Sequence, residues 1–157
     1  MEIERKWLTA TWPALPETQR IEMRQGYLSL HPSVRIRSEC CAGHTNYVLC
    51  IKGAGTLVRE EIELPLTEEQ FSRLEQMIGR PLIEKQQRRY ALPECLVLEV
   101  NQVDAGQPSE FFYAEVEFSS VQQALSWQPG ELAGYFTKEV TSAPGQSMGE
   151  YWQRTRL

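Results

Sequence analysis

Several features that mark other classes of protein are missing from this chain of 157 residues. No stretch approaches the roughly 20 consecutive apolar residues of a membrane-spanning helix. The amino-terminal residues Met1–Leu8 carry charges where a secretion signal needs an apolar core. The chain also lacks low-complexity tracts and long polar linkers. These absences argue against a membrane partner and predict one globular domain over residues 1–157, located in the cytoplasm.

Positive charge is scarce as well. The chain has 16 Lys and Arg residues against 21 Asp and Glu residues, which gives a formal net charge of -5. Proteins that coat nucleic acids use net positive charge to neutralise phosphates. We therefore expect no nucleic-acid partner, and any site for an anion has to be local.

Cysteine and histidine are too few and too scattered for two common kinds of site. The four cysteines show no CxxC spacing, which predicts reduced thiols in place of zinc ligands or a disulfide framework. His31 precedes a proline and His44 follows a glycine, and neither has a Ser or Cys partner pattern. They are better interpreted as turn or surface histidines than as catalytic bases.

Alternation of apolar and polar residues with a period of two dominates the rest of the chain and predicts strands. The predicted strands are Glu2–Lys6, Val34–Arg37, Tyr47–Lys52, Val58–Leu64, Lys85–Leu92, Cys95–Asn101 and Phe112–Phe118. Between two of them, Gly53-Ala54-Gly55 is typical of a hairpin turn and not of a phosphate-binding loop.

Two helices are indicated by capping signals, and a third is possible at the carboxyl end. Thr67 followed by Gln70 forms a capping box, and a helical apolar stripe then runs to Gly79. Ser119 or Ser120 can cap a shorter helix that ends before Pro129-Gly130. The segment Met148–Leu157 is the third candidate.

Like-charged residues recur in pairs on single faces of these strands. The pairs are Glu2 with Glu4, Arg35 with Arg37, Glu61 with Glu63, and Glu115 with Glu117. Carboxylates two residues apart on a strand point to the same side, where they suit a hard cation such as Mg²⁺ or Mn²⁺. Paired guanidinium groups suit phosphate oxygens. Together they favour metal-dependent phosphoryl chemistry, and no nucleophile motif competes with it.

A plainer interpretation is a β-rich scaffold with one solvated, charged face, whose cross-strand ion pairs are each worth less than about 1 kcal/mol. It holds well for any single strand. It is weaker for the whole set, because solvated faces normally mix Ser, Thr and Gln with Lys, whereas these faces favour Glu and Arg. A lipocalin-like barrel is disfavoured too, since its interior would be apolar.

In their order along the chain, these segments resemble the signature of the CYTH superfamily, the triphosphate tunnel metalloenzymes. Met1-Glu2-Ile3-Glu4-Arg5-Lys6 is similar to the amino-terminal ExExK motif of that family. The other matching segments are Val34–Arg37, Ile51–Gly53, Arg59–Glu63, Ile83–Lys85 leading to Arg89-Tyr90, Leu98–Val100, Ala114–Phe118 and Lys138–Thr141. The ordered set spans nearly the whole chain.

The resemblance implies an α+β fold, mainly antiparallel β, with an eight-stranded closed β-tunnel and a few helices packed outside it. It implies that Lys6, Arg35, Arg37, Lys52, Arg59, Lys85 and Arg89 contact the phosphates of a small-molecule triphosphate. It further implies that Glu2, Glu4, Glu61, Glu63, Glu115 and Glu117 hold one or two Mg²⁺ or Mn²⁺ ions. Glu63, Arg37 and Lys85 are the expected catalytic residues.

The expected activity is metal-dependent hydrolysis of a linear triphosphate, with inorganic tripolyphosphate as the first candidate substrate, by a monomer or homodimer. Alternatives within the family are a thiamine triphosphatase and an adenylate cyclase. A non-catalytic module that binds polyphosphate or a nucleotide is an alternative of another class.

The chain departs from the family pattern in three places. Two extra residues separate Lys85 from Arg89-Tyr90, although the even shift keeps Lys85 and Arg89 on one face. At the usual EVD run, either Asn101 replaces the acid or Asp104 acts in its place after a bulge. After Thr141 the family's charged continuation is absent, which predicts the loss of one substrate contact.

Overall fold

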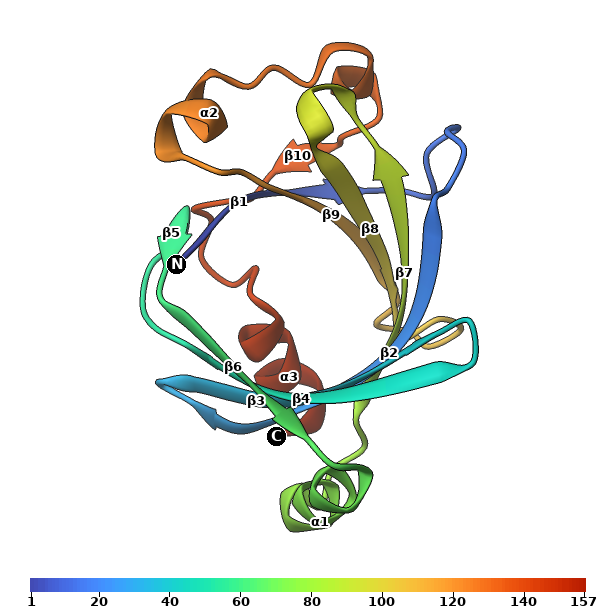
Figure 1. Ribbon diagram of the computed structural model, residues 1–157, viewed down its shortest axis with the longest axis vertical. Helices are drawn as coiled ribbons and strands as arrows, with labels where there is room; N and C mark the ends of the chain where they lie inside the picture. Colours follow the sequence, from blue (N-terminus) through green and yellow to red (C-terminus); the bar gives the residue numbers. More distant parts are fainter.

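The computed structural model describes residues 1–157 and consists mainly of one antiparallel sheet (Figure 1). Its ten strands are β1 (Glu2–Thr9), β2 (Gln19–Leu30), β3 (Ser33–Cys41), β4 (His44–Lys52), β5 (Val58–Arg59), β6 (Glu61–Leu66), β7 (Ile83–Ala91), β8 (Val97–Val103), β9 (Phe111–Glu117) and β10 (Lys138–Glu139). The helices are α1 (Glu68–Ile78), α2 (Val121–Ser126) and α3 (Met148–Arg156), with short 3₁₀ turns at Pro93–Cys95 and Gly130–Gly134. None of these helices combines the length and hydropathy needed to cross a membrane.

The sheet curls into a nearly closed barrel. Its strand order is β10-β1-β9-β8-β7-β2-β3-β4-β6, and β5 pairs with β1 through Glu2 opposite Arg59 and Ile3 opposite Val58. Because only Glu60 separates β5 from β6, one stretch of chain pairs with β4 at its end and with β1 at its start. This stretch joins the two sides of the sheet and completes the ring of strands in Figure 1.

Strand alternation places the main apolar core outside the barrel wall. Outward side chains of β1, β7, β8 and β9 include Trp7, Tyr90 and Leu98, which are almost fully buried. They pack against Ala124 of α2 and Leu132 of the second 3₁₀ turn. The opposite, inward face of the same strands is thereby free to carry polar and charged residues.

A second apolar cluster attaches α1 and α3 to the other side of the barrel. Phe71 of α1 and Met148, Tyr151 and Trp152 of α3 belong to it. Figure 1 shows α1 outside the ring of strands and α3 within its outline. Helix α3 begins at a capping box formed by Ser147 and Glu150, and it contacts β2.

The predicted fold class is confirmed, with a difference in the strand count. Eight strands have six or more residues, and β5 and β10 are additional strands of two residues each. The Thr67 capping box, the left-handed Gly79 and the Ser120 cap are present as predicted, and the third helix is α3. The segment before β8 differs from prediction because Pro93–Cys95 forms a 3₁₀ turn.

Strand β2 is missing from the sequence prediction, although it lies between β3 and β7. Its inward residues alternate as Ile21, Met23, Gln25 and Tyr27, all buried, so a polar residue interrupts the apolar pattern. On the outward face of β2, Gly26 has no side chain and interrupts the alternating pattern. A Cβ at Gly26 would lie 2.4 Å from Leu82 Cδ2, so a larger residue there would displace the Leu82 side chain.

Candidate active site

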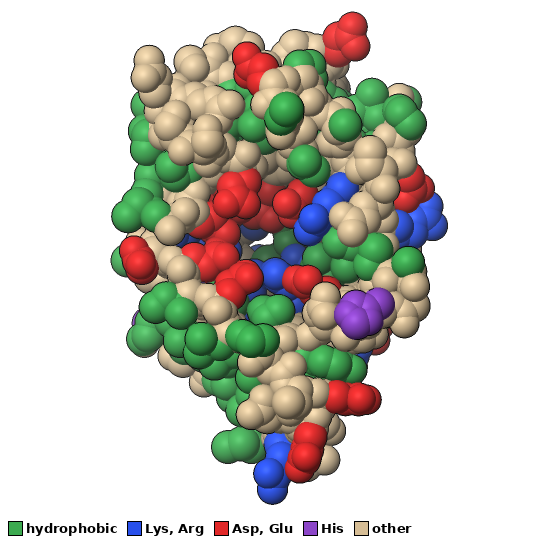
Figure 2. Space-filling view, in the orientation of Figure 1, with side chains coloured by type: hydrophobic (Ala, Val, Ile, Leu, Met, Phe, Trp, Pro, Cys, Tyr) green, Lys and Arg blue, Asp and Glu red, His purple; other side chains and the backbone are tan.

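The interior of the barrel is a cavity of about 1070 Å³ lined mainly by polar and charged residues. Figure 2 shows it as a hollow surrounded by acidic and basic side chains. All the residues predicted for the site line this cavity: Glu2, Glu4, Lys6, Arg35, Arg37, Lys52, Arg59, Glu61, Glu63, Lys85, Arg89, Glu115 and Glu117. They converge because each occupies an inward position on a strand of one closed wall.

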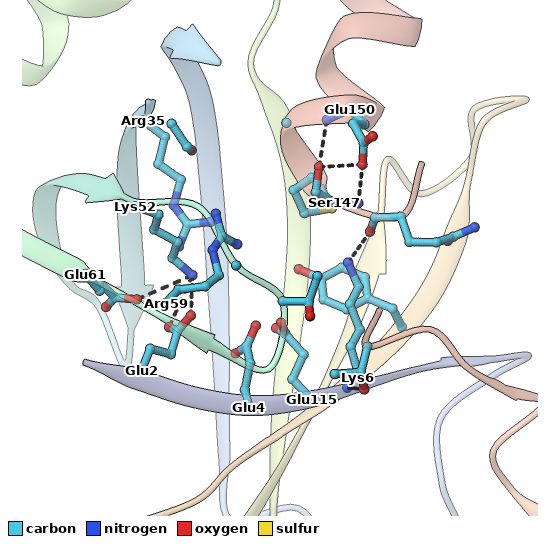
Figure 3. A pocket seen from close by; sticks show the side chains of 18 of the residues that line it. Glu2, Glu4, Lys6, Arg35, Lys52, Arg59, Glu61, Glu115, Ser147 and Glu150 are labelled. Atoms are coloured by element: carbon cyan, nitrogen blue, oxygen red, sulfur yellow. Dashed lines mark hydrogen bonds and ion pairs between the residues drawn. The ribbon is translucent and has the colours of Figure 1, made fainter. Parts of the chain in front are cut away.

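The basic side chains come from five strands and approach the cavity from several directions. Lys6 lies on β1, Arg35 and Arg37 on β3, Lys52 on β4, Arg59 on β5, and Lys85 and Arg89 on β7. Figure 3 shows Arg35, Lys52 and Arg59 close together, with Glu2 beside Lys52 and with Glu4 and Glu115 farther along β1 and β9. Such an arrangement can surround a chain of phosphate groups.

One ion-pair cluster joins β1, β4 and β6. Lys52 Nζ lies 2.9 Å from Glu2 Oε1 and 3.4 Å from Glu61 Oε2 (Figure 3). Burial and the neighbouring Glu61 carboxyl raise the pKa of Glu2, although Lys52 opposes this shift. The cluster places two carboxyl groups beside one ammonium group, so it can accept further positive charge.

A second carboxyl pair, Glu4 and Glu115, lies deeper. Glu4 is opposite Glu117 in the β1–β9 register, and Glu115 is opposite Lys6. Burial and the adjacent Glu115 raise the pKa of Glu4 well above its usual range. Burial acts on Glu115 as well, but hydrogen bonding with Glu4 and the nearby ammonium groups of Lys6 and Lys85 outweigh it and hold its pKa low. The two carboxyl groups are therefore coupled, and Glu4 holds a proton more tightly than Glu115 does.

Two lysines meet at Tyr113, on the inner wall. Lys85 donates a hydrogen bond of 2.7 Å to the Tyr113 hydroxyl, and Lys6 Nζ lies 4.3 Å from the centre of the ring. Lys6 also donates to the Gln146 carbonyl at 2.6 Å. Burial lowers the pKa of both lysines, and that of Lys85 falls well below its usual value. An anionic ligand would offset this cost of burying positive charge.

Glu63 lies nearer to solvent than Glu4 and Glu115. Its carboxylate is 3.8 Å from Arg37, which also pairs with Glu39 at 2.5 Å. Together with Glu61 and the buried Cys50, Glu63 forms a group whose potential ligand atoms lie within 4.8 Å of one another. Glu63 is thus held beside a guanidinium group and remains accessible from the cavity.

The donor set fits a hard divalent cation. Carboxylate oxygens gather from β1, β6 and β9, and the raised pKa values of Glu2, Glu4 and Glu117 have burial as their first cause and neighbouring carboxylates among the others. Mg²⁺ and Mn²⁺ prefer such oxygen ligands and would relieve the repulsion between them.

Several lining residues were not predicted as part of the site. They are Tyr27, Glu39, Gln87, Glu99 and Tyr113 on strands, together with Ser147, Glu150 and Gln153 at α3. For Gln87 and Glu99 the signal was available, because Gln87 shares parity with Lys85 and Arg89, and Glu99 faces away from the buried Leu98 and Val100. For the residues at α3 the sequence held no such signal, because the apolar pattern of a helix does not show where on the barrel the helix packs.

Neither candidate for the family's missing acid lines the cavity. Asn101 is an inward residue of β8 but is fully buried beneath Gln87, whose amide donates to its side-chain oxygen at 3.1 Å. Asp104 is buried elsewhere and accepts hydrogen bonds from Arg156, Tyr151 and the backbone of Glu84. The role suggested for Asp104 was therefore wrong: it anchors α3.

The segment after Thr141 also reaches the cavity, and the loss of one substrate contact there stays a prediction. Ser142, Ala143, Pro144 and Gln146 line the cavity, and the Gln146 carbonyl binds Lys6. The chain thus supplies backbone groups at the end of the cavity where a charged continuation was expected. His31 lies in an exposed turn at the cavity edge, and His44 is exposed at the start of β4.

The chain is similar in sequence and in structure to known triphosphatases. An inorganic triphosphatase from Nitrosomonas europaea is 34% identical over 140 residues, covering 89% of this chain and 89% of that protein. A crystal structure of an inorganic triphosphatase matches with a TM-score of 0.65 at 29% identity, covering 96% of this chain and 93% of the other. No protein-family model matches the chain.

A putative adenylyl cyclase from Hippeastrum, described as having a dominant triphosphatase activity, also matches in structure. Its TM-score is 0.65 at 17% identity, and the match covers 100% of this chain and 97% of the other. At that identity the similarity establishes a shared fold and no more.

Proposed function

Because the chain belongs to the CYTH family of triphosphate tunnel metalloenzymes, we propose that it hydrolyses a linear triphosphate inside the barrel, with inorganic tripolyphosphate as the main substrate. The observation that carries the proposal is the convergence of seven basic and six acidic side chains on one cavity. A solvated charged face would not enclose them.

Binding is assigned to the basic wall. Lys6, Arg35, Arg37, Lys52, Arg59, Lys85 and Arg89 contact the phosphate oxygens. Buried ammonium and guanidinium groups without counter-charges are costly, so the substrate's negative charge stabilises them when it enters. Arg35 and Arg37 act as a pair because their side chains leave the same face of β3.

The carboxylates are assigned to metal binding. Glu2, Glu4, Glu61, Glu115 and Glu117, with Glu63 at the edge, hold one or two Mg²⁺ or Mn²⁺ ions. Such an ion, when bound, neutralises charge on the phosphate oxygens.

For the chemical step we assign Glu63, Arg37 and Lys85. Glu63 is accessible from the cavity and orients the attacking water in line with the terminal phosphorus. The new bond joins the water oxygen to that phosphorus, while the bond to the bridging oxygen breaks and pyrophosphate leaves. Arg37 and Lys85 stabilise the charge that develops on the phosphate oxygens.

The lining argues against a nucleotide as the main substrate. Tyr27 and Tyr113 are the only Phe, Tyr or Trp residues among the lining residues, and both are nearly fully buried in the wall, while His31 lies in an exposed turn at the cavity edge. No exposed Phe, Tyr or Trp ring is therefore available inside the barrel for stacking an adenine or a thiazole. This favours inorganic tripolyphosphate over ATP and thiamine triphosphate, and hydrolysis over adenylate cyclisation.

The test is phosphate release from tripolyphosphate, thiamine triphosphate and ATP, each with Mg²⁺, Mn²⁺ or a chelator, with cyclic AMP measured beside it. We expect metal-dependent turnover that is fastest with tripolyphosphate. Cyclic AMP formation from ATP would instead identify a cyclase. Tight binding with no turnover would identify a module that only binds polyphosphate.

We further propose that residues 1–157 act as one domain in the cytoplasm, as a monomer or homodimer. All four cysteines are free thiols, which agrees with a reducing compartment. Light scattering on the purified protein measures the oligomeric state.

A further inference from the structure

Gln87 occupies an unusual place in the basic wall. It lies on β7 between Lys85 and Arg89, with the same inward orientation, and it lines the cavity. The inward positions before and after it on β7 carry full charges, whereas Gln87 is neutral and only 3% exposed. Its amide is therefore placed to act on its neighbours more than on a ligand.

Gln87 accepts a hydrogen bond from Arg89 and donates one to Asn101. Arg89 Nε donates to Gln87 Oε1 at 2.9 Å, and Gln87 Nε2 donates to Asn101 Oδ1 at 3.1 Å. Because a guanidinium group can only donate, it fixes the Gln87 oxygen toward itself and the amide nitrogen toward Asn101. Asn101 lies directly opposite Gln87 in the β7–β8 register, so the two amides form a short chain that ends on Arg89.

This chain holds Arg89 without neutralising it. Arg37 and Lys52 each pair with two carboxylates, whereas Arg89 has no ion-pair partner; Glu99 lies opposite it in register without forming one. The hydrogen bond from Nε uses the nitrogen farthest from the tip of the side chain. The terminal nitrogens keep their positive charge and their donors, apart from a 3.5 Å contact with Gln19.

The amide chain has a cost. Asn101 is fully buried, and its Nδ2 has no hydrogen-bond partner in the protein. A buried donor left unpaired is unfavourable, and an apolar pair of similar size would be at least as stable. The amides therefore contribute to the geometry of Arg89 more than to the stability of the barrel.

We infer that Gln87 and Asn101 are positioning residues. They orient the terminal nitrogens of Arg89, which have no ion-pair partner, toward the triphosphate. The inference rests on the proposed function, in which Arg89 contacts the substrate. It adds that an amide relay in the wall sets the affinity of this contact.

The outer face of β7 offers a matched control. Arg88 Nε donates to Gln86 Oε1 at 2.9 Å, and Gln86 donates to Glu22. The same local arrangement of Arg and Gln thus occurs one residue away, facing out of the barrel. Gln86→Met removes the same groups as Gln87→Met without affecting the cavity.

The experiment measures kcat, KM and melting temperature with tripolyphosphate for Q87M, Q86M, R89M and the double variant Q87M/R89M. We expect Q87M to raise KM about tenfold, as for loss of a hydrogen bond to a charged group, and Q86M to change it less than about twofold. In the R89M background Q87M should have no further effect, because its action passes through Arg89. Q87M/N101L should keep the melting temperature of the native protein and still raise KM.

The outcomes separate the inference from the proposed function. An equal effect of Q87M with and without Arg89 would overturn the positioning role. A KM unchanged by R89M would show that Arg89 does not contact the substrate, and the binding assignment would fail with it. If the native protein did not hydrolyse tripolyphosphate at all, the proposed function itself would be refuted.

Discussion

Asp104 and Arg156 form a doubly hydrogen-bonded ion pair that is almost completely shielded from solvent. The two terminal nitrogens of Arg156 lie 2.7 and 3.0 Å from the Asp104 carboxylate oxygens, and the side chains are 7% and 1% exposed. Arg156 also donates to the Pro81 and Leu82 carbonyls. The pair thus joins the last turn of α3 to the segments at the ends of β7 and β8.

The first prediction concerns this anchor. Replacing Arg156 by Met leaves the Asp104 carboxylate buried without its partner, which typically costs about 3–5 kcal/mol. We expect a loss of that order in the free energy of unfolding, measured by urea denaturation. Arg73→Met is the control, because Arg73 and Glu69 form a pair exposed by 77% and 82% and should change stability by less than about 0.5 kcal/mol.

The second prediction is the pH dependence of stability contributed by Asp104. Burial raises the pKa of this carboxyl, but the hydrogen bonds from Arg156 and Tyr151 outweigh burial, and the net shift is downward from 3.8. A carboxyl whose pKa is lower in the folded state stabilises the fold above its unfolded pKa. That stabilisation is lost as the pH falls from about 4 through the folded value.

Melting temperatures of the native protein and D104N, measured from about pH 7 to pH 3, test this sign. The difference between them should be largest near neutral pH and should shrink below about pH 4. A difference that stays constant with pH would show that Asp104 acts through packing alone. The comparison is needed because Glu2, Glu4 and Glu117, with raised pKa values, shift stability in the opposite sense.

The period-two alternation predicted which residues share a polar strand face. In a closed barrel the inward faces of all strands line the same interior, so most of these residues lie at one cavity. Once Glu2, Arg35 and Glu115 were placed on polar strand faces, closure of the sheet brought them to one cavity. The sequence did not reveal β2, because Gln25 takes an apolar position in its pattern. It could not reveal the pairing of Asp104 with Arg156 either, since 52 residues separate them.

The third prediction concerns Arg37 at the proposed reaction centre. Arg37→Met removes a guanidinium group that faces the cavity and lies near Glu63. Loss of one donor to a developing negative charge typically lowers kcat by about a hundredfold or more. We expect kcat to fall by that order and KM to rise, measured by phosphate release. Arg24→Met, which removes an outer ion pair with Glu75, should leave both within about twofold.

The fourth prediction is stabilisation by ligand. A ligand that binds only the folded state at 100 times its Kd adds about 2.7 kcal/mol to the free energy of unfolding. For a chain of this length that corresponds to a rise in melting temperature of roughly 5 °C or more. We expect it with tripolyphosphate plus Mg²⁺, and not with sodium chloride of equal ionic strength. A flat melting temperature across the titration would argue against the site.

The last prediction separates the metal-binding carboxylates from the rest of the acidic residues. Glu4 lies against Glu115 and opposite Glu117, so Glu4→Gln and Glu117→Gln each remove one anionic ligand from the same group. The amide keeps the size of the side chain but binds a hard cation more weakly than a carboxylate does. Both variants should therefore lose metal-dependent phosphate release and, in the absence of substrate, bind Mn²⁺ more weakly when followed by electron paramagnetic resonance. Glu84→Gln, at an exposed position on the outer face of β7, should match the native protein in both measurements. Full activity and unchanged Mn²⁺ binding in both cavity variants would refute the assignment of these carboxylates.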